Sequence, residues 1–194
     1  MRKKRDTDLR SELILAGIDE INTYGANDFS VRRVAAACHV STAAPYKHFK
    51  DKKEFIGAII DFVNEQWAVV QDQVIAGCGD DPRTQMVEVA VAYTKFLMEK
   101  PYYRQILMLK NAEFDNLYHR KRGEINSRTQ QIMARVRNAY NLTDEIWERK
   151  ALLVRSLLFG SVFMFDSGEF TYNEKALENI RYLIDRELDR KSVV

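Results

Sequence analysis

The sequence is poor in the residues that interrupt helices. Its 194 residues include only three prolines and eight glycines, against 46% hydrophobic and 30% charged residues. Proline and glycine are the least favourable residues in a helix interior, and a chain of this size buries a sizeable core. The composition therefore predicts an all-α protein, and no stretch has the pattern of a strand, a repeat or a low-complexity tract.

Cysteine is also scarce. Cys38 and Cys78 are the two cysteines, and no spaced Cys/His cluster accompanies them, so we expect neither a metal site nor a cofactor. No signal-peptide pattern precedes them, and lone cysteines suit a reducing compartment. We therefore expect a cytoplasmic protein.

Long hydrophobic runs are missing as well. The run Leu152–Phe165 contains Arg155 and is shorter than the ~20 residues that span a bilayer. We expect a buried helix there and no membrane segment. Arg155 would then need a partner, because an unpaired buried charge is costly.

Charge is distributed unevenly along the chain. Met1–Lys53 holds 11 lysines and arginines against 7 aspartates and glutamates, a net charge of +4, whereas the remainder holds 19 against 21, a net charge of −2. A basic head on a slightly acidic body fits contact with nucleic acid through the head alone.

The segment Ser30–Lys53 has the pattern of a helix-turn-helix. Ser30 is suited to cap a first short helix that breaks at Cys38–Val40, and Ser41 offers a cap for a second helix over Thr42–His48. Asp51, followed by Glu54, predicts a capping box at the start of a third helix. In a helix-turn-helix the second helix enters the major groove of DNA.

Polar and basic side chains on this segment suit contact with DNA. The candidate DNA contacts are Arg32, Arg33, Ser41, Thr42, Ala44, Tyr46, Lys47, His48 and Lys52. The hydroxyl and methyl groups of Thr42 and Ala44 suit base edges, whereas Tyr46 and Lys47 can reach bases or phosphates. Arginines of the first helix lie where that helix crosses the DNA backbone, and a helix N-terminus favours a phosphate. The alternative is a small helical subdomain with ordinary solvated side chains.

The same segment resembles the DNA-binding signature of TetR-family regulators. The family's Ala-Gly-Val-Ser-like turn corresponds to Cys38-His39-Val40-Ser41, and its Tyr-x-His-Phe motif corresponds to Tyr46-Lys47-His48-Phe49 with Lys52 beyond it. The resemblance covers Leu9–Ile60. It implies an N-terminal three-helix DNA-binding domain followed by a helical effector-binding and dimerisation domain.

The resemblance also implies roles for individual residues. Tyr46, His48 and Lys52 would contact phosphates, and Arg32 and Thr42 would approach bases. Phe49 would belong to the small core of the domain.

Two residues depart from the family pattern. His39 stands where the family usually has glycine, at a turn position that needs a left-handed backbone, a conformation in which histidine is enriched. Pro45 lies inside the expected recognition helix, where it removes one hydrogen bond and disfavours helix at Ala44. We expect the recognition helix to begin irregularly.

The remaining sequence predicts further helices. We expect helices over residues 6–24, 52–76, 82–99, 102–110, 117–140, 144–167 and 174–191. Asp81, Thr143 and Asn173 are suited to cap the starts of three of them. We divide the chain into a DNA-binding domain, residues 1–53, and a ligand-binding and dimerisation domain, residues 54–194.

The last two helices are candidates for a dimer interface. Ser156 and Gly160 lie one turn apart and would let another helix approach closely. The two helices could form half of a four-helix bundle across a two-fold axis, or they could simply cover the core of their own subunit. The family resemblance favours a homodimer.

Bulky apolar residues in the second half suggest an effector pocket. The candidate ligand-binding residues are Tyr93, Phe96, Tyr103, Ile106, Phe114, Arg155, Phe159 and Phe163. Aromatic walls with a few polar groups are typical of ligand cavities, although a filled core explains the same residues. Arg155 could pair with Asp166 or Glu169 of the partner subunit, or with an anionic effector.

The helix-turn-helix pattern predicts DNA binding, and the family resemblance implies a ligand-responsive repressor that binds a palindromic DNA operator as a homodimer and is released by a small-molecule effector, with activation as the alternative outcome. We expect no enzymatic activity, because the i,i+4 pairs Asp61/Glu65 and Asp115/His119 are ordinary on exposed helix faces. The alternatives are a helical dimerisation or adaptor protein and, beyond that, a helical enzyme.

Overall fold

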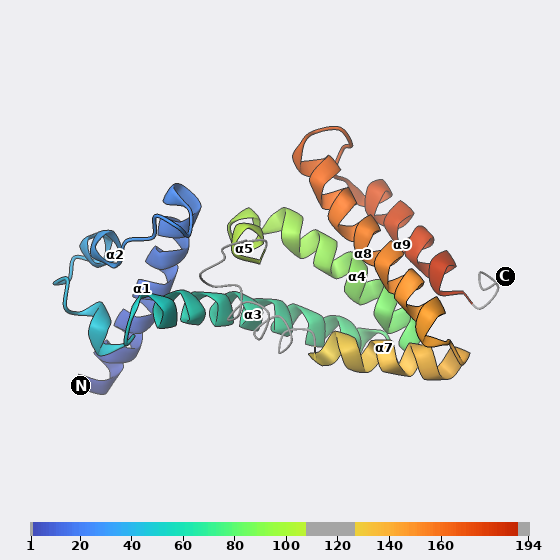
Figure 1. Ribbon diagram of the computed structural model, residues 1–194, viewed down its shortest axis with the longest axis horizontal. Helices are drawn as coiled ribbons and strands as arrows, with labels where there is room; N and C mark the ends of the chain where they lie inside the picture. The colour runs from blue at the N-terminus through green and yellow to red at the C-terminus, as the bar shows by residue number, and fades with distance from the viewer. Residues whose placement is uncertain (1, 108–126, 190–194) are drawn as a thin grey trace. The chain divides into compact units, whose positions relative to one another are not determined.

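The chain is all helical over the residues that the structure describes. The structure is a computed structural model, which describes residues 2–107 and 127–189, and no strand occurs among them. In chain order the elements are α1 (Arg2–Tyr24), α2 (Val31–Ala37), the 3-10 helix η1 (Pro45–Lys47), α3 (Lys52–Gly77), α4 (Pro82–Glu99), α5 (Pro101–Leu107), α7 (Ser127–Tyr140), α8 (Asp144–Asp166) and α9 (Glu174–Leu188) (Figure 1). The predicted all-α fold is confirmed. The predicted helix over 117–140 is described only from Ser127, and the predicted end of the last helix at Lys191 lies outside the described residues.

The described residues fall into two compact units. The first contains the chain up to Gln66 together with α5, and the second contains Trp67–Lys100 together with α7, α8 and α9. Helix α3 contributes its first part to one unit and its last part to the other.

Helices α2, α4, α8 and α9 begin with the side-chain caps that the sequence predicts. In each cap, a side-chain oxygen accepts a hydrogen bond from the backbone N–H three residues later. The four bonds are Arg33 N to Ser30 Oγ (3.3 Å), Thr84 N to Asp81 Oδ2 (2.9 Å), Ile146 N to Thr143 Oγ1 (3.3 Å) and Ala176 N to Asn173 Oδ1 (2.9 Å). Each cap satisfies a backbone N–H that has no partner inside its helix. Helix α1 begins at Arg2, so the predicted start near Asp6 is wrong. The arginines and lysines that precede Asp6 favour helix, and no breaker separates them from it.

Helix α1 is the centre of the first unit, where it packs against both α2 and α5. Leu13, Ile14, Ile18 and Ile21 are buried along it. The close approach of α3 requires a glycine at position 17, because a Cβ there would lie 2.6 Å from Ile59 Cδ1.

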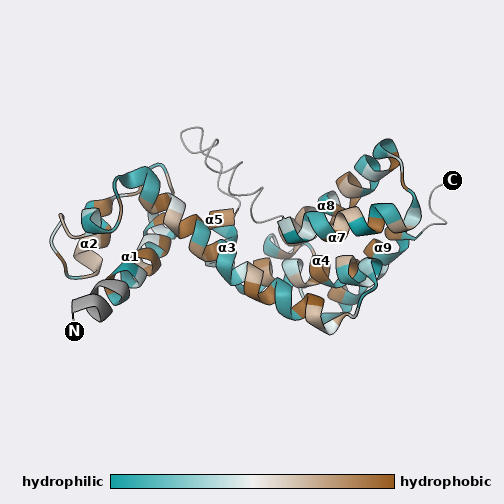
Figure 2. Ribbon diagram, turned by 90° about the horizontal axis from the view of Figure 1, so that it is seen from below, coloured by the Kyte–Doolittle hydropathy of each residue, from teal (hydrophilic) through white to brown (hydrophobic). Residues whose placement is uncertain are grey.

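Helix α4 is the centre of the second unit, where it packs against α7, α8 and α9. Helices α8 and α9 also contact each other and lie side by side (Figure 1). Hydrophobic residues recur along α3 and α4 (Figure 2), and nine residues of α4 are buried. This density of buried residues is what a helix covered on several sides requires.

Candidate nucleic-acid interface

The turn after α2 has the left-handed residue that the sequence predicts. His39 has φ 55°, and its N–H donates to Ala36 O (3.0 Å) while Val40 N–H donates to Ala35 O (3.0 Å). This pair of bonds is a Schellman motif, which satisfies the last carbonyls of α2 and reverses the chain sharply. The turn of the helix-turn-helix is therefore built by the backbone of Ala35–Val40.

The recognition segment is shorter and tighter than predicted. An α-helix over Thr42–His48 is not formed: a turn is followed by the single 3-10 turn of η1. Three of its hydrogen bonds join residues three apart, from Ala44 N to Ser41 O (2.9 Å), Lys47 N to Ala44 O (3.1 Å) and His48 N to Pro45 O (2.9 Å). One bond of α-helical spacing follows, from Phe49 N to Pro45 O (3.0 Å). Pro45 supplies no N–H, so a continuous α-helical ladder is interrupted at its beginning.

The predicted cap of this segment is also wrong. Ala44, rather than Ser41, precedes η1, and no side chain caps it. The backbone carbonyl of Ser41 accepts the Ala44 N–H instead, which leaves the Ser41 side chain exposed.

Aromatic packing anchors the recognition segment to α3. Pro45 and Phe49 are buried, and Phe49 stacks on Phe55 with ring centroids 4.0 Å apart. The opposite neighbour of Phe55 is Phe29, in an edge-on contact at 5.4 Å. The expected core position of Phe49 is confirmed. Phe55 is fully buried and contacts an aromatic ring on each side of the helix-turn-helix, Phe29 before α2 and Phe49 after η1.

Most predicted DNA contacts lie exposed on this anchored frame. The exposed ones are Arg32, Arg33, Ser41, Thr42, Tyr46 and Lys47, and the half-buried ones are Ala44, His48 and Lys52. Tyr46 is 56% exposed although it lies next to the buried Pro45. Lys52 Nζ donates to Asn27 O (3.2 Å), which ties the start of α3 to the loop before α2.

Arg33 is held by the protein itself. Its Nε donates to Glu20 Oε1 (2.8 Å), its Nη2 donates to the same oxygen and to Asp28 O (2.5 Å), and its guanidinium lies 4.2 Å from the centre of the Tyr24 ring. Hydrogen bonding to Glu20 raises the pKa of Arg33 above its usual value. Sequence reasoning missed Glu20, although its position one turn beyond Ala16 and Gly17 placed an acidic residue on the apolar stripe of α1.

Helix α3 begins with a variant of the predicted capping box. Glu54 N donates to Asp51 Oδ1 (2.8 Å), as expected. The Glu54 carboxylate accepts from Lys50 N (2.8 Å), one residue before the cap. Both bonds fix the entry of the chain into α3 directly after the recognition segment.

The predicted ligand-binding residues are divided between the two compact units. Tyr93 and Phe96 pack on Trp67 in the second unit, with ring centroids 4.8 and 5.4 Å apart. Tyr103 contacts Phe62 in the first unit, at 6.3 Å, where Ile106 is buried. Phe114 lies outside the described residues.

The predicted residues of α8 lie on its exposed face. Arg155, Phe159 and Phe163 are all exposed, Phe163 by 71%. The buried side of α8 within this chain is formed by other residues, among them Val154, Leu158 and Val162. The pairing of Arg155 with a partner subunit or with an anionic effector stays a prediction.

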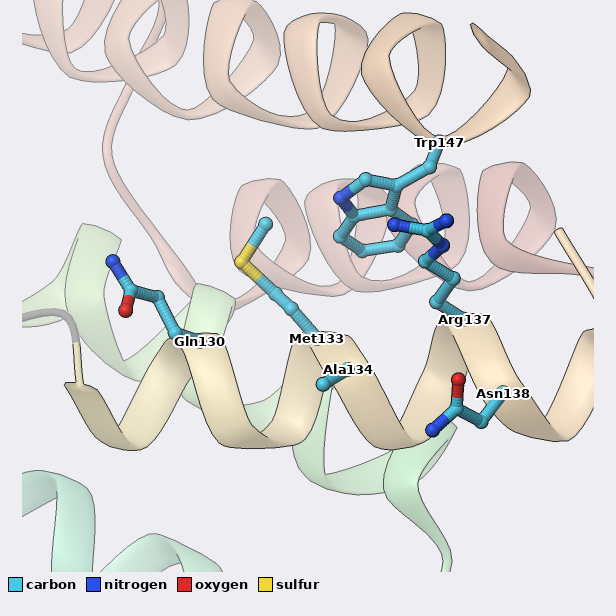
Figure 3. Close-up of a pocket in the computed structure, with 6 residues that line it drawn as sticks. All are labelled: Gln130, Met133, Ala134, Arg137, Asn138 and Trp147. Carbon is cyan, nitrogen blue, oxygen red and sulfur yellow. The ribbon is translucent and has the colours of Figure 1, made fainter. Parts of the chain in front are cut away.

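A shallow groove lies between α7 and α8 in the second unit. Its lining residues are Gln130, Met133, Ala134, Arg137, Asn138 and Trp147. Met133 and Arg137 point from α7 toward α8, from which Trp147 reaches down to them (Figure 3). Arg137 is engaged by Asp144 and by Leu142 O (3.3 Å). None of the predicted ligand-binding residues lines this groove.

The described part of the chain has no candidate for two further classes of site. No cluster of three or more His, Cys, Asp or Glu side chains has the arrangement of a metal site there. None of its helices combines the length and the hydrophobicity that crossing a membrane requires.

Residues 13–59 match the family model of the bacterial regulatory proteins of the tetR family. This stretch contains the Schellman turn, the recognition segment and the start of α3. A search of curated proteins found no match.

Solved structures share the fold over nearly the whole chain. A candidate fatty acid metabolism regulator from Clostridium perfringens has a TM-score of 0.74 at 17% identity and covers 91% of this chain and 97% of that one. A TetR family transcription regulator from Marinobacter aquaeolei VT8 has a TM-score of 0.72 at 17% identity, with coverages of 96% and 98%. A TetR-like transcriptional regulator from Rhodococcus sp. RHA1 has a TM-score of 0.68 at 15% identity, with 94% of each chain covered.

The helix-turn-helix lies within residues 13–59, the stretch that matches this family of bacterial regulatory proteins. Over the rest of the chain the likeness is one of fold, to solved structures of 15 to 17% identity that include a TetR family transcription regulator and a TetR-like transcriptional regulator. The matched family consists of regulatory proteins rather than enzymes, in agreement with the prediction from sequence.

Proposed function

We propose that this protein is a ligand-responsive repressor that binds a palindromic operator as a homodimer and is released by a small-molecule effector. The observation that carries the proposal is the recognition segment, whose apolar residues Pro45 and Phe49 are buried while Thr42, Tyr46 and Lys47 stay exposed. The proposal assigns DNA binding to residues 1–53 and effector binding and dimerisation to residues 54–194.

The proposed DNA contacts divide by chemistry. Arg32 and Thr42 approach base edges, with Ser41 and Ala44 beside them, because guanidinium, hydroxyl and methyl groups suit the major groove. Tyr46, Lys47, His48 and Lys52 contact phosphates, which position the protein without reading sequence.

Exposed apolar residues on the last two helices support a homodimer. On α8 they are Leu152, Leu153, Phe159 and Phe163, and on α9 they are Tyr182 and Leu183. A second copy would remove this apolar surface from water. A Cβ added at Gly160 would meet nothing within 4 Å in the same chain, which leaves room for a partner helix to approach. Arg155 would then face the partner, where Asp166 or Glu169 of the partner subunit could pair with it.

A buried amide in the second unit supports an effector site among the middle helices. Gln71 has no exposed surface, its Nε2 donates to Thr129 Oγ1 (2.8 Å), and its Oε1 has no hydrogen-bond partner in the described structure. Buried acceptors are normally satisfied, so an effector that donates a hydrogen bond would complete the site. Trp67, Tyr93 and Phe96 would offer it aromatic neighbours.

Helix α3 connects this effector site to the DNA-binding end. Gln71 and Lys52 lie on the same helix, which contributes to both compact units. An effector that prefers one orientation of α3 would shift the population of DNA-binding conformers by its difference in affinity for the two states.

Selection of bound fragments from random duplex DNA tests this proposal. The dimer should enrich a palindrome whose half-sites lie about one helical turn, ~34 Å, or a wider equivalent apart. Substituting Thr42 with valine should change which DNA sequence is preferred, whereas substituting Lys47 with alanine should weaken binding to all DNA sequences alike.

The salt dependence of binding separates a regulator from an adaptor with a basic surface. A specific operator complex keeps its preference for one DNA sequence as the salt concentration rises. Binding by charge attraction alone weakens with salt to the same extent for every DNA sequence. If the intact protein enriched no sequence at any salt concentration, the proposed function would be wrong.

A further inference from the structure

Arg33 differs from its neighbour Arg32 in how many groups hold its side chain. Arg32 is exposed, and no hydrogen bond or ion pair involves it within the described ranges. The Arg33 guanidinium is held by Glu20 Oε1, by Asp28 O and by the face of the Tyr24 ring. Two adjacent arginines on α2 thus have different environments, although their sequence positions suggest the same role.

Glu20 is the fixed point of this arrangement. Its side chain comes from α1 and is 7% exposed, and its Oε1 accepts from Ser30 N (3.0 Å) as well as from Arg33. Ser30 is also the N-cap of α2. One buried carboxylate therefore accepts hydrogen bonds both from the backbone N–H of the N-cap residue Ser30 and from the side chain of Arg33 in the first turn of α2.

The pair selects one orientation of α2. A buried carboxylate is stable only where its partners surround it, so a rotation of α2 on α1 would leave the Glu20 charge unpaired. The recognition segment follows α2 through the Schellman turn, and its direction depends on that of α2.

We infer that Glu20 and Arg33 are positioning residues for DNA binding: their ion pair sets the orientation of α2, and Arg33 is not itself a phosphate contact. The inference rests on the proposed function and revises the role of DNA contact that the sequence suggested for Arg33. The competing possibility is that Glu20 merely supports an Arg33 that binds phosphate with its remaining N–H groups.

The salt dependence of operator affinity distinguishes these two roles. Loss of a phosphate contact reduces the slope of log K against log salt concentration by about 1. We expect Arg33→Ala to weaken operator binding roughly tenfold with the slope of the wild-type protein. Arg33→Lys keeps the charge but loses the paired geometry, and should also weaken binding without a change in slope. A slope reduced by about 1 in Arg33→Ala, with Arg33→Lys retaining wild-type affinity, would overturn the inference.

Glu20→Gln gives a second test through the sign of its effect. If only long-range charge mattered, removing a negative charge would strengthen attraction to DNA. Loss of positioning predicts the opposite, a weaker complex, and the double variant Glu20→Gln/Arg33→Ala should bind about as well as either single variant, because both remove the same interaction. Stronger binding by Glu20→Gln, or additive losses in the double variant, would contradict the inference.

Amide hydrogen exchange of the full chain without DNA keeps this test separate from the proposed function. Glu20→Gln should accelerate exchange of the Ser30 and Arg33 amides while the amides of the second unit keep their wild-type rates. If the wild-type protein bound no operator, the repressor proposal would fail, and the exchange rates would still decide whether Glu20 holds α2. If the Ser30 amide of Glu20→Gln exchanged at the wild-type rate, the inference would be contradicted, even if the wild-type protein bound its operator.

Discussion

At the scale of single residues, the helix-turn-helix depends on a backbone conformation that most side chains avoid. His39 has φ 55°, and its exposed side chain has no packing reason to be histidine. Left-handed backbone costs an L-residue roughly 1–2 kcal/mol, and glycine avoids that cost. Position 39 therefore requires a residue that tolerates the left-handed backbone, and it does not require the imidazole side chain.

This requirement predicts opposite effects of glycine at two nearby positions. His39→Gly should leave the free energy of unfolding unchanged or raise it by up to about 1 kcal/mol, whereas His39→Val should lower it by roughly 1–2 kcal/mol. Ala36→Gly, at an exposed position inside α2, should lower it by about 1 kcal/mol. Denaturant unfolding followed by circular dichroism measures all three, and a stabilised His39→Val would contradict this account of the turn.

At the scale of elements, each unit has one central helix that neighbours approach closely. In the first unit that helix is α1, and at Gly17 the side chains of α3 lie too close to leave room for a Cβ. A methyl group at position 17 would meet Ile59 Cδ1 at 2.6 Å and Ile59 Cγ1 at 3.3 Å. Packing, rather than helix propensity, explains a glycine in the middle of α1.

The balance of two effects predicts the outcome of Gly17→Ala. Alanine gains about 1 kcal/mol in helix propensity, and overpacking a core costs typically 1–3 kcal/mol. We expect a net loss of about 1 kcal/mol in the free energy of unfolding. Ile59→Val removes the clashing Cδ1 atom, so the double variant should be more stable than the sum of the two single losses predicts.

Thermal and denaturant unfolding of the four proteins completes this cycle. Gly77→Ala is a control, because a Cβ there meets nothing within 4 Å, and it should be neutral or stabilising. Strict additivity of Gly17→Ala and Ile59→Val would show that the two side chains do not compete for the same space.

At the scale of the whole molecule, the proposed repressor depends on a second copy of the chain. The outer side of α8 presents Leu152 and Phe163, which are 69% and 71% exposed. Binding of a palindromic operator couples dimerisation to DNA affinity, because two half-sites must be occupied together.

A charge on that face should separate the subunits. Phe163→Glu is expected to give a monomer by sedimentation equilibrium, because burying an unpaired carboxylate in an apolar interface is costly. Operator affinity should fall by at least tenfold as the joint occupation of two half-sites is lost. Val69→Glu places the same charge at an exposed apolar position of α3, and this control should remain dimeric. A Phe163→Glu protein that stays dimeric would place the interface elsewhere.

The sequence by itself determined the features that depend on neighbours along the chain. The caps at Ser30, Asp81, Thr143 and Asn173 and the left-handed His39 were predictable, because each involves a backbone group only a few residues away.

Only the tertiary structure decided which side of each helix is covered. Periodicity showed that α8 is apolar, and it could not show that Val154 is buried while Phe163 is exposed, because burial depends on helices distant in sequence. The pairing of Glu20 with Arg33 across α1 and α2 was hidden for the same reason. A local pattern fixes hydrogen bonds within a turn, whereas the partners of a side chain depend on how whole helices pack.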